Sequence, residues 1–482
     1  MRVLEQLEPK NVLSFFEDLC AIPHGSGNTK AISDYCVKFA ESRGLEVHQD
    51  GLNNVVIVKP ATPGYEAAPT VIVQGHLDMV AEKTPDSPIN FLTDGLELEV
   101  DGDFIRAKGT TLGGDDGIAV AMALAVLDAK DLAHPRLECL FTIDEETGMD
   151  GAVGFDASIL QGKRLLNIDS EEEGILTVSC AGGAHAAVRI PMTANECALD
   201  SAEIRISGLK GGHSGAEIDK GRANATITLG RVLQALVDEL EVRLVSAEGG
   251  LKDNAIPNAA RAVIALEDGK LPRAQEICAE LQDTFRREYA AADPDVTVTF
   301  TPGTVASQAL TLRDTKKVCC FLGLYPNGIE SMSMDIPGLV QTSCNLGIFK
   351  VDGSGLKGSG SVRSSIASRK QLLLRRIGLL AEGLDGTLCV SGEYPAWEYR
   401  RESHLRDVMC KVYKDQYGQD MKVEAIHAGL ECGLFCGKIP GLDAVSFGPN
   451  LYDIHTVKEH MSISSVQRVY AYLCAVLQAL KD

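Results

Sequence analysis

The sequence predicts an α/β protein with a mostly parallel mixed sheet and helices on both faces, interrupted by an inserted α+β domain. In the first third of the 482 residues, short apolar runs that end in polar residues alternate with stretches of helical spacing. From about residue 186 the pattern changes to strands and hairpins separated by long helices, and the last stretch returns to the first pattern. We therefore expect the core in residues 1–185 and 396–482 and the insert in residues 186–395.

The first third contains four predicted strands, NNVVIVKP, PTVIVQGHLD, RLECLFTIDEE and RLLNIDSEEEG. Between them, NTKAISDYCVKFAESRG starts with polar capping residues, has apolar residues at helical spacing and closes on Gly44. GIAVAMALAVLD is rich in alanine and can pack closely against a sheet. Strands that alternate with helices indicate parallel pairing, and such sheets place their ligands just beyond the strand ends.

The insert contains further predicted strands in SAEIRIS, ARAVIAL and PDVTVTFTPG, with the helix RAQEICAELQDTFRREYAA between the last two. ANATITLG is a strand or a helix that leads into a longer helix. The segment around Gly353–Gly358 matches GxGxxG, but a strand follows it, so we interpret it as a hairpin turn and exclude a dinucleotide site. The order of elements suggests two similar halves.

Composition excludes several classes of function. The net charge of −21 argues against a nucleic-acid partner, because phosphate binding needs a basic face. No apolar run is long enough to span a membrane, and the polar, acidic N-terminus lacks the apolar region of a signal peptide, so we expect a cytoplasmic protein. The 14 cysteines are then mostly buried thiols, and Cys432 and Cys436 have no second pair with zinc-finger spacing.

Five motifs carry side chains that could perform chemistry, each at the end of a predicted strand or the start of a helix. Taken alone, each also has a structural explanation, such as a helix cap, a solvated acidic loop or a satisfied histidine. Alternate residues of a strand face the same side, so His76 and Asp78 can point together. The candidates are His76, Asp78, Asp115, Asp116, Glu145, Glu146, Asp169 and His455.

Together these residues predict a metal site within one α/β domain. Mixed histidine and carboxylate ligands suit zinc, manganese or cobalt, and there is no set of thiolates. Two metal ions at about 3.5–4 Å would need a bridging carboxylate, and such a pair is a common device for hydrolysis. The three glutamates after Asp169 are interpreted as a solvated turn.

The ordered set HLD, GGDDG, DEETG, NIDSEEEG and HTVKE resembles the co-catalytic zinc peptidases, which include glutamate carboxypeptidase, acetylornithine deacetylase, carnosinase and bacterial dipeptidases. IPHGSGN, LKGGHSGAEI and IHAGLECGLF resemble the aminoacyl-histidine (Xaa-His) dipeptidase branch. The similarity runs over nearly the whole chain. It implies a zinc-peptidase core with an inserted lid and dimerisation domain.

The resemblance also implies roles. His76 would bind one metal ion and His455 the other, Asp115 would bridge the two, and Glu146 would join one metal ion and Asp169 the other. Glu145 would be the general base that takes a proton from the attacking water and delivers it to the leaving amine. Asp78 would orient His76, and Asp116 is treated as a neighbour of the ligands.

Five further residues would bind substrate. His213 in GGHSG would stabilise the oxyanion of the tetrahedral intermediate. Asn254 and Arg363 would hold the substrate carboxylate, while Gly429 and Glu431 would line the pocket. Because the insert is about twice as long as in smaller relatives, His213 could act within one chain or across a dimer.

The resulting hypothesis is a dipeptidase for small peptides such as Xaa-His or carnosine-like substrates, working with two divalent ions. Zinc is expected, with cobalt or manganese able to substitute, and a homodimer is expected through the lid domain. Lid motion is a further hypothesis. Alternatives are an N-acyl amino-acid deacylase or a tripeptidase on the same metal core, a metal-binding scaffold without activity, and a thiol protein built on the cysteines.

Overall fold

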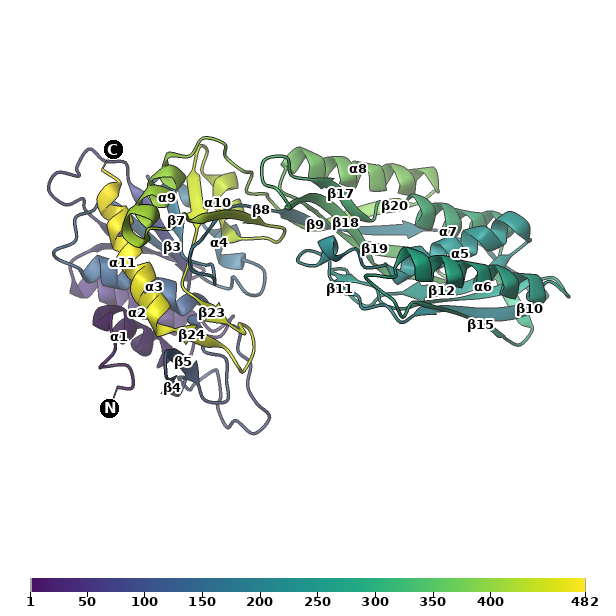
Figure 1. Ribbon diagram of the computed structural model, residues 1–482, viewed down its shortest axis with the longest axis horizontal. Coiled ribbons are helices and arrows are strands. Elements are labelled where there is room, and N and C mark those ends of the chain that lie inside the picture. Colours follow the sequence, from purple (N-terminus) through teal and green to yellow (C-terminus); the bar gives the residue numbers. More distant parts are fainter. Residues whose placement is uncertain (1, 482) are drawn as a thin grey trace. The chain divides into compact units, whose positions relative to one another are not determined.

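The computed structural model describes residues 2–481, which form two compact units. Unit 1 comprises the residues up to Ser179, Tyr399–Ala425 and the stretch from Leu430 onward. Unit 2 comprises Cys180–Glu398 and the short segment Ile426–Gly429. The sequence predicts boundaries after residues 185 and 395, and in the structure the chain also enters unit 2 a second time at Ile426–Gly429. Figure 1 labels the elements of both units.

Unit 1 is built on an eight-stranded mixed sheet with the order β1-β2-β6-β3-β7-β22-β8-β21. The strands β6, β3, β7 and β22 are parallel, and β1, β2 and β8 add antiparallel pairs at the flanks. Every residue of β3 and β6 is buried, which is typical of strands covered by helices on both faces. The strands are β1 (Glu46–Gln49), β2 (Val55–Lys59), β3 (Val71–His76), β6 (Leu137–Thr142), β7 (Arg164–Asn167), β8 (Ile175–Cys180), β21 (Lys422–Ile426) and β22 (Asp443–Ser446).

The helices predicted in the first third and in the last stretch are confirmed. In α3, every residue from Gly114 to Leu127 is buried, and its alanines allow the close approach to β3. A smaller sheet, β23-β24-β5-β4, joins the C-terminal stretch to a hairpin near residue 100. Its strands are β4 (Leu98–Asp101), β5 (Phe104–Ala107), β23 (Leu451–Tyr452) and β24 (His460–Ser462). The helices are α1 (Lys10–Cys20), α2 (Lys30–Ser42), α3 (Gly114–Asp128), α4 (Asp150–Gly154), α9 (His404–Tyr417), α10 (Glu431–Lys438) and α11 (Ile463–Ala479).

Unit 2 repeats one topology twice within a single sheet. Its first half has the strand order β15-β10-β14-β12, and its second half has β18-β19-β9-β20. If the four strands of a half are numbered 1 to 4 along the chain, their order across the sheet is 4-1-3-2. This is the βαββαβ arrangement. The strands are β9 (Gly182–Ile190), β10 (Ala194–Ser207), β12 (Arg243–Gly249), β14 (Ala260–Leu266), β15 (Thr297–Pro302), β18 (Val340–Asp352), β19 (Gly355–Ser364) and β20 (Thr387–Tyr394).

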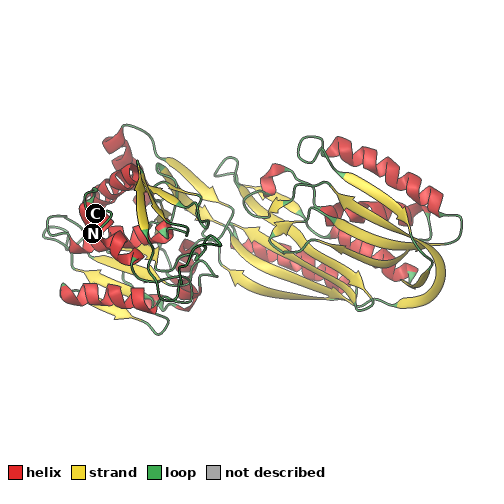
Figure 2. Cartoon of the chain, turned by 90° about the horizontal axis from the view of Figure 1, so that it is seen from below, coloured by secondary structure: helices red, strands yellow, loops and turns green. Residues whose placement is uncertain are grey.

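The two halves join where β12 pairs antiparallel with β18, and the four helices lie on one face of the sheet (Figure 2). Short strands complete the unit: β16 (Ala306–Leu310) on β10, β17 (Gly328–Met332) on β18, and the pair β11 (Gly212–His213) with β13 (Ala255–Ile256). The helices are α5 (Ala225–Glu239), α6 (Leu271–Glu288), α7 (Leu312–Leu324) and α8 (Ala367–Gly383).

Two local ambiguities in the insert are settled by the structure. The segment that was a strand or a helix is the first turn of α5, because the side chain of Asn224 accepts hydrogen bonds from the amides of Thr226 and Ile227. The GxGxxG segment is a hairpin, as predicted: β18 ends at Asp352, which pairs with Gly355 at the start of β19. Within residues 2–481, no helix combines the length and the apolar character that a bilayer crossing requires.

Candidate metal centre

Parallel strand ends bring the predicted ligands of unit 1 together. His76 is the last residue of β3, which pairs in parallel with both β6 and β7. Glu145 and Glu146 follow β6 and Asp169 follows β7, so all of these side chains start at the same edge of the sheet. Asp115 enters from the start of α3, and His455 comes from the loop between β23 and β24.

Asp115 lies at the middle of the five predicted ligands. Its Oδ1 is 3.2 Å from His76 Nε2, and its Oδ2 is 3.1 Å from His455 Nε2. On one side, His76 Nε2 is 3.8 Å from Asp169 Oδ1. On the other side, His455 Nε2 is 2.9 Å from Glu146 Oε1. The five side chains therefore form two overlapping groups that share the carboxylate of Asp115.

This donor set fits divalent cations. Glu146 Oε1 is buried and lies 2.9 Å from His455 Nε2, as expected of two atoms that bind one cation. Asp115 and Glu146 raise the pKa of His455 to about 10, so in the metal-free protein a proton on His455 takes the place of a positive ion. Burial, followed by the nearby Asp116, raises the pKa of Asp169 well above its ordinary value. Several carboxylates gathered in a buried space need compensating charge, and cations supply it.

Glu145 lies beside the ligands with its carboxyl group mostly buried. Burial, together with the neighbouring carboxylates of Glu431, Glu146 and Asp115, raises its pKa to about 8, although the charge on His76 opposes the shift. A carboxyl group with a pKa near neutrality can both accept and return a proton. The position and the acidity of Glu145 thus suit proton transfer.

Asp78 holds three of the site residues in place. Its backbone carbonyl lies 2.9 Å from His76 Nδ1, an arrangement in which His76 Nε2 is left to face the cation site. Its side chain is 1 % exposed and accepts hydrogen bonds from the amides of Glu145 at 3.0 Å and Glu146 at 3.3 Å. The hydroxyl of Ser26, from the IPHGSGN segment, donates to the same carboxylate at 2.8 Å. Asp78 therefore orients the glutamate pair as well as the histidine.

Glu459 is a site residue that sequence reasoning did not assign. Its buried carboxylate accepts hydrogen bonds from the backbone amides of Leu112 at 2.7 Å, Gly113 at 3.1 Å and Gly114 at 2.8 Å. These amides immediately precede Asp115, so Glu459 fixes the loop that presents the shared carboxylate. The glutamate was visible in HTVKE, but nothing local in the sequence indicated three amide partners far away in the chain.

Asp116 is a neighbour of the ligands that supports His76. Its Oδ2 accepts a hydrogen bond from the backbone amide of His76 at 3.1 Å. The close approach requires glycine at position 75, because a Cβ there would lie 2.5 Å from the same oxygen. Asp116 also forms a possible ligand group with His76 and Asp169, in which the donor atoms lie within 4.8 Å of one another.

Two glutamates are placed differently from the sequence expectation. Glu431 was expected to line the substrate pocket, but it is fully buried and accepts hydrogen bonds from Gln74 at 2.6 Å and Thr142 at 2.8 Å, on the strands β3 and β6. Glu173 lies in the turn that was expected, but its side chain is not solvated as expected, because its carboxylate forms a two-point ion pair with Arg468. Both glutamates were misplaced because their partners are distant in sequence.

The other four predicted substrate residues lie in unit 2, and three of them meet around Gly215. A Cβ on Gly215 would be 3.0 Å from the His213 ring and 3.2 Å from Arg363 Nε. The carbonyl of Asn254 accepts a hydrogen bond from Ser214 in the same loop at 2.9 Å. The guanidinium of Arg363 is buried and donates to Tyr394 Oη at 3.0 Å, while its Nε has no partner among the described residues.

Gly429 lies beside this group, because a Cβ on it would meet the ring of Tyr394 at 2.8 Å. His427, two residues earlier, is 2.7 Å from the hydroxyl of Ser343. Burial and the charge of Arg363 lower the pKa of His427 to about 4, so this histidine is neutral. Unit 2 therefore gathers an unpaired guanidinium nitrogen and two histidines in one place.

Comparison with known proteins agrees with this geometry. The chain is 34 % identical over 482 residues to the cytosol non-specific dipeptidase of Escherichia coli (strain K12), covering 100 % of this chain and 99 % of that protein. It is 36 % identical to the crystal structure of aminoacylhistidine dipeptidase from Vibrio alginolyticus, with a TM-score of 0.95 over 99 % of this chain and 98 % of that one.

A more distant structure, aminopeptidase PepT from Bacillus cereus ATCC 10987, shares the fold at 16 % identity and a TM-score of 0.56, covering 99 % of this chain and 100 % of that one. Residues 72–479 match the description Peptidase family M20/M25/M40. That range contains all five predicted metal ligands, the whole of unit 2 and most of unit 1. The chain belongs to Peptidase family M20/M25/M40.

Proposed function

We propose that this protein is a metal-dependent dipeptidase that hydrolyses the peptide bond of short unblocked peptides, including Xaa-His dipeptides. The observation that carries the proposal is the position of Asp115, whose two carboxylate oxygens each lie within 3.2 Å of a different histidine ring. His76 and Asp169 would hold one divalent ion and His455 and Glu146 the other, and the carboxylate of Asp115 would serve both. The names of the Escherichia coli and Vibrio alginolyticus relatives support the substrate class.

Divalent ions bound there would lower the pKa of a water molecule and polarise the scissile carbonyl. The carboxylate of Glu145 removes a proton from the attacking water while the oxygen bonds to the carbonyl carbon. The same carboxyl group then gives this proton to the amide nitrogen as the carbon–nitrogen bond breaks. The carboxylate of Asp78 keeps Glu145 in position by accepting a hydrogen bond from the backbone amide of Glu145. The products are an amino acid with a new carboxylate and an amino acid with a free amine.

His213 is suited to stabilise the oxyanion. Its Nδ1 accepts hydrogen bonds from the amides of Gly215 at 3.3 Å and Ala216 at 3.0 Å. In the neutral ring the proton must then be on Nε2, which makes Nε2 a hydrogen-bond donor. Arg363 and Asn254 bind the substrate carboxylate, and the unpaired, buried Nε of Arg363 supports this assignment. Gly429 leaves space beside Tyr394. Glu431 supports the zinc site from inside unit 1 and does not contact the substrate.

Zinc is the proposed metal, with cobalt or manganese able to replace it, because mixed imidazole and carboxylate donors suit all three. We place the protein in the cytoplasm, as the name of the Escherichia coli relative suggests. A homodimer through unit 2, the lid, is proposed as well. Mixing Glu145→Gln protein with His213→Ala protein tests whether His213 serves its own chain or a partner, because activity would return only if His213 acts across the dimer.

The test is an activity panel on zinc-loaded protein with β-Ala-His, Gly-His, Leu-Leu, a tripeptide and an N-acetyl amino acid. Glu145→Gln keeps the size of the side chain but removes the base, so we expect kcat to fall about 10²- to 10⁴-fold. Two metal ions should remain bound. Glu172→Gln is the matched control, since Glu172 is exposed and nearby, and its activity should stay unchanged.

Each outcome of the panel has a defined meaning. Cleavage of free dipeptides that depends on Glu145 supports the proposal. Preference for the N-acetyl substrate would make the protein a deacylase, and preference for the tripeptide would make it a tripeptidase. Two bound metal ions without any cleavage would make it a metal-binding scaffold. Activity that survives chelation but is lost on thiol alkylation would identify a thiol enzyme.

A further inference from the structure

The loops that carry Asp169 and His455 meet each other behind the metal centre. The amide of Leu451 donates to the carbonyl of Glu171 at 3.0 Å, which ties the segment before His455 to the segment after Asp169. Gly448, before His455, also approaches Ser170, after Asp169. Glycine is required at position 448, because a Cβ there would overlap the carbonyl oxygen of Ser170. The loop after Asp169 and the loop before His455 are therefore in direct contact, although the two residues are assigned to different metal ions.

The loop with His455 has an unfavourable backbone conformation. Asp453 has φ 51° and His455 has φ 60°, both in the left-handed region that non-glycine residues rarely occupy. Such conformations persist where the surrounding structure determines them. The loop with Asp169 has a different difficulty, because Glu171, Glu172 and Glu173 follow it and their like charges repel one another. Both loops consequently need support from elsewhere in the fold.

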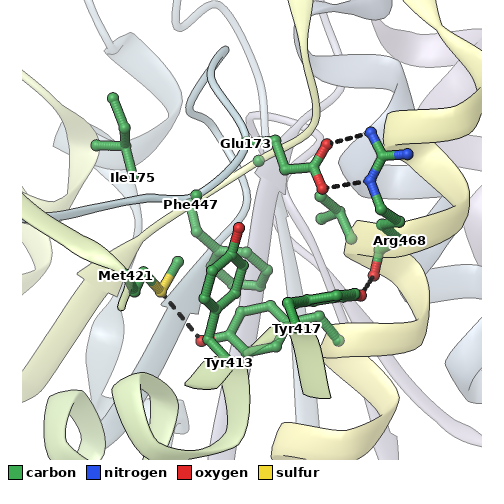
Figure 3. A pocket seen from close by; sticks show the side chains of 11 residues that line it. Glu173, Ile175, Tyr413, Tyr417, Met421, Phe447 and Arg468 are labelled. Carbon is green, nitrogen blue, oxygen red and sulfur yellow. Dashed lines mark hydrogen bonds and ion pairs between the residues drawn. The ribbon is translucent and has the colours of Figure 1, made fainter. Parts of the chain in front are cut away.

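That support comes from α11 and Asn450. Arg468 on α11 pairs with Glu173 through Nε at 2.6 Å and Nη2 at 2.7 Å, which engages both carboxylate oxygens (Figure 3). The amide of Glu173 donates to Asn450 Oδ1 at 2.7 Å, and the amide of Asn450 donates to Ser465 Oγ at 2.9 Å. The side chain of Glu173 is 12 % exposed and that of Arg468 is 44 % exposed, so water reaches the arginine side of the ion pair.

We propose that the Glu173–Arg468 ion pair is a positioning device for the metal centre, which holds the loops of Asp169 and His455 at the spacing that two divalent ions require. The proposal rests on the proposed function only in assigning Asp169 and His455 as ligands. Arg468 touches neither ligand and acts through Glu173 and Asn450. A lysine at position 468 would keep the charge but could not form the same two-point contact.

The test measures the zinc affinity of the metal-free protein by competition with a chromophoric chelator. The variants are Glu173→Gln, Arg468→Gln, Arg468→Lys and the double variant that combines Glu173→Gln with Arg468→Gln. Loss of support for metal ligands typically weakens metal affinity about 10- to 100-fold, and we expect that loss for Arg468→Gln. Arg468→Lys should recover part of it. The double variant should lose no more than the worse single one, because both single changes break the same contact.

Tyr417→Phe is the matched control. Tyr417 lies beside the ion pair and donates from its hydroxyl to the backbone carbonyl of Arg468 at 2.6 Å, so the variant removes a contact of α11 but keeps both charged groups of the ion pair (Figure 3). Its zinc affinity should equal that of the unaltered chain, even if the unfolding midpoint falls. The visible spectrum of the cobalt-loaded protein is the second readout, and it should change in Arg468→Gln but not in Tyr417→Phe.

Two results would overturn the proposal. One is unchanged zinc affinity in Arg468→Gln and Glu173→Gln, with only the unfolding midpoint lowered, which would make the pair purely structural. The other is an equal loss of affinity in Tyr417→Phe, which would indicate general loosening of α11. The measurement uses zinc and cobalt without substrate. If the unaltered chain binds metal but cleaves no peptide, the proposed function fails while the positioning role stands or falls by these affinities.

Discussion

Replacing Asp78 with asparagine tests the geometry of the metal centre directly, because the carboxylate of Asp78 holds the glutamate pair while its backbone carbonyl still contacts His76. Asp78 Oδ1 accepts the amide of Glu145 at 3.0 Å, and Oδ2 accepts the amide of Glu146 at 3.3 Å and the hydroxyl of Ser26 at 2.8 Å. In asparagine one oxygen becomes an NH2 group, so one of the glutamate amides must face another donor. The substitution therefore removes at least one hydrogen bond to a charged acceptor.

A hydrogen bond to a charged group contributes about 1.5–3 kcal/mol, which corresponds to a loss of about 10- to 150-fold in kcat/KM if the bond positions Glu145 in the transition state. The assay is steady-state hydrolysis of Gly-His by zinc-loaded protein. Ser26→Ala is the graded control, because it removes only the neutral donor at the same carboxylate, and its loss should be smaller. An Asp78→Asn protein with kcat/KM within twofold of the unaltered chain would refute the reasoning.

Four further outcomes are expected. Glu459→Ala leaves three buried amides without an acceptor, at about 1–3 kcal/mol each, so urea unfolding should show a loss of several kcal/mol and an unchanged midpoint would contradict the role given to Glu459. Chelation should lower the thermal midpoint, since zinc at 100 times its Kd stabilises the fold by about 2.7 kcal/mol per site; equal midpoints would argue against a built metal site. The pKa of His427 is lowered to about 4, so the folded state binds fewer protons than the unfolded one, and stability should fall by about 2 kcal/mol from pH 7 to pH 5 through this group. His427→Gln should flatten the profile of stability against pH between pH 7 and pH 5. An identical profile would contradict the lowered pKa of His427. Glu431→Gln should weaken zinc binding more than it raises KM, whereas a change in KM alone would return Glu431 to the substrate pocket.

Four of the five predicted ligands stand at positions that a local pattern defines, whereas His455 was assigned through the family resemblance. His76, Glu146 and Asp169 follow apolar runs that are recognisable as strands, and parallel strands bring their carboxyl ends to one edge. Asp115 precedes an alanine-rich helix and is flanked by glycines, which is also a local signal. The alternation of strands and helices likewise predicted the α/β core before any contact was known.

The doubled topology of unit 2 was only suggested by the order of its elements. The second half begins with β9 and continues after the whole first half, so the repeat is interrupted in the chain. The two halves are joined by only three paired residues of β12 and β18. The sequences of these strands do not differ from those of ordinary edge strands that pair with nothing. Register across such a junction is decided by packing and not by local sequence.

The sequence by itself determined which residues could hold two metal ions and in which kind of fold, since periodicity and strand ends are local properties of the chain. Only the tertiary structure decided which acidic groups are solvated and which are bound. Glu173 and Arg468 are 295 residues apart, and Glu431 meets Gln74 across 357 residues. The same three letters, EEE, are compatible with a fully solvated turn or with a glutamate in a two-point ion pair, because the free energy of a carboxylate depends on the partner that folding brings to it.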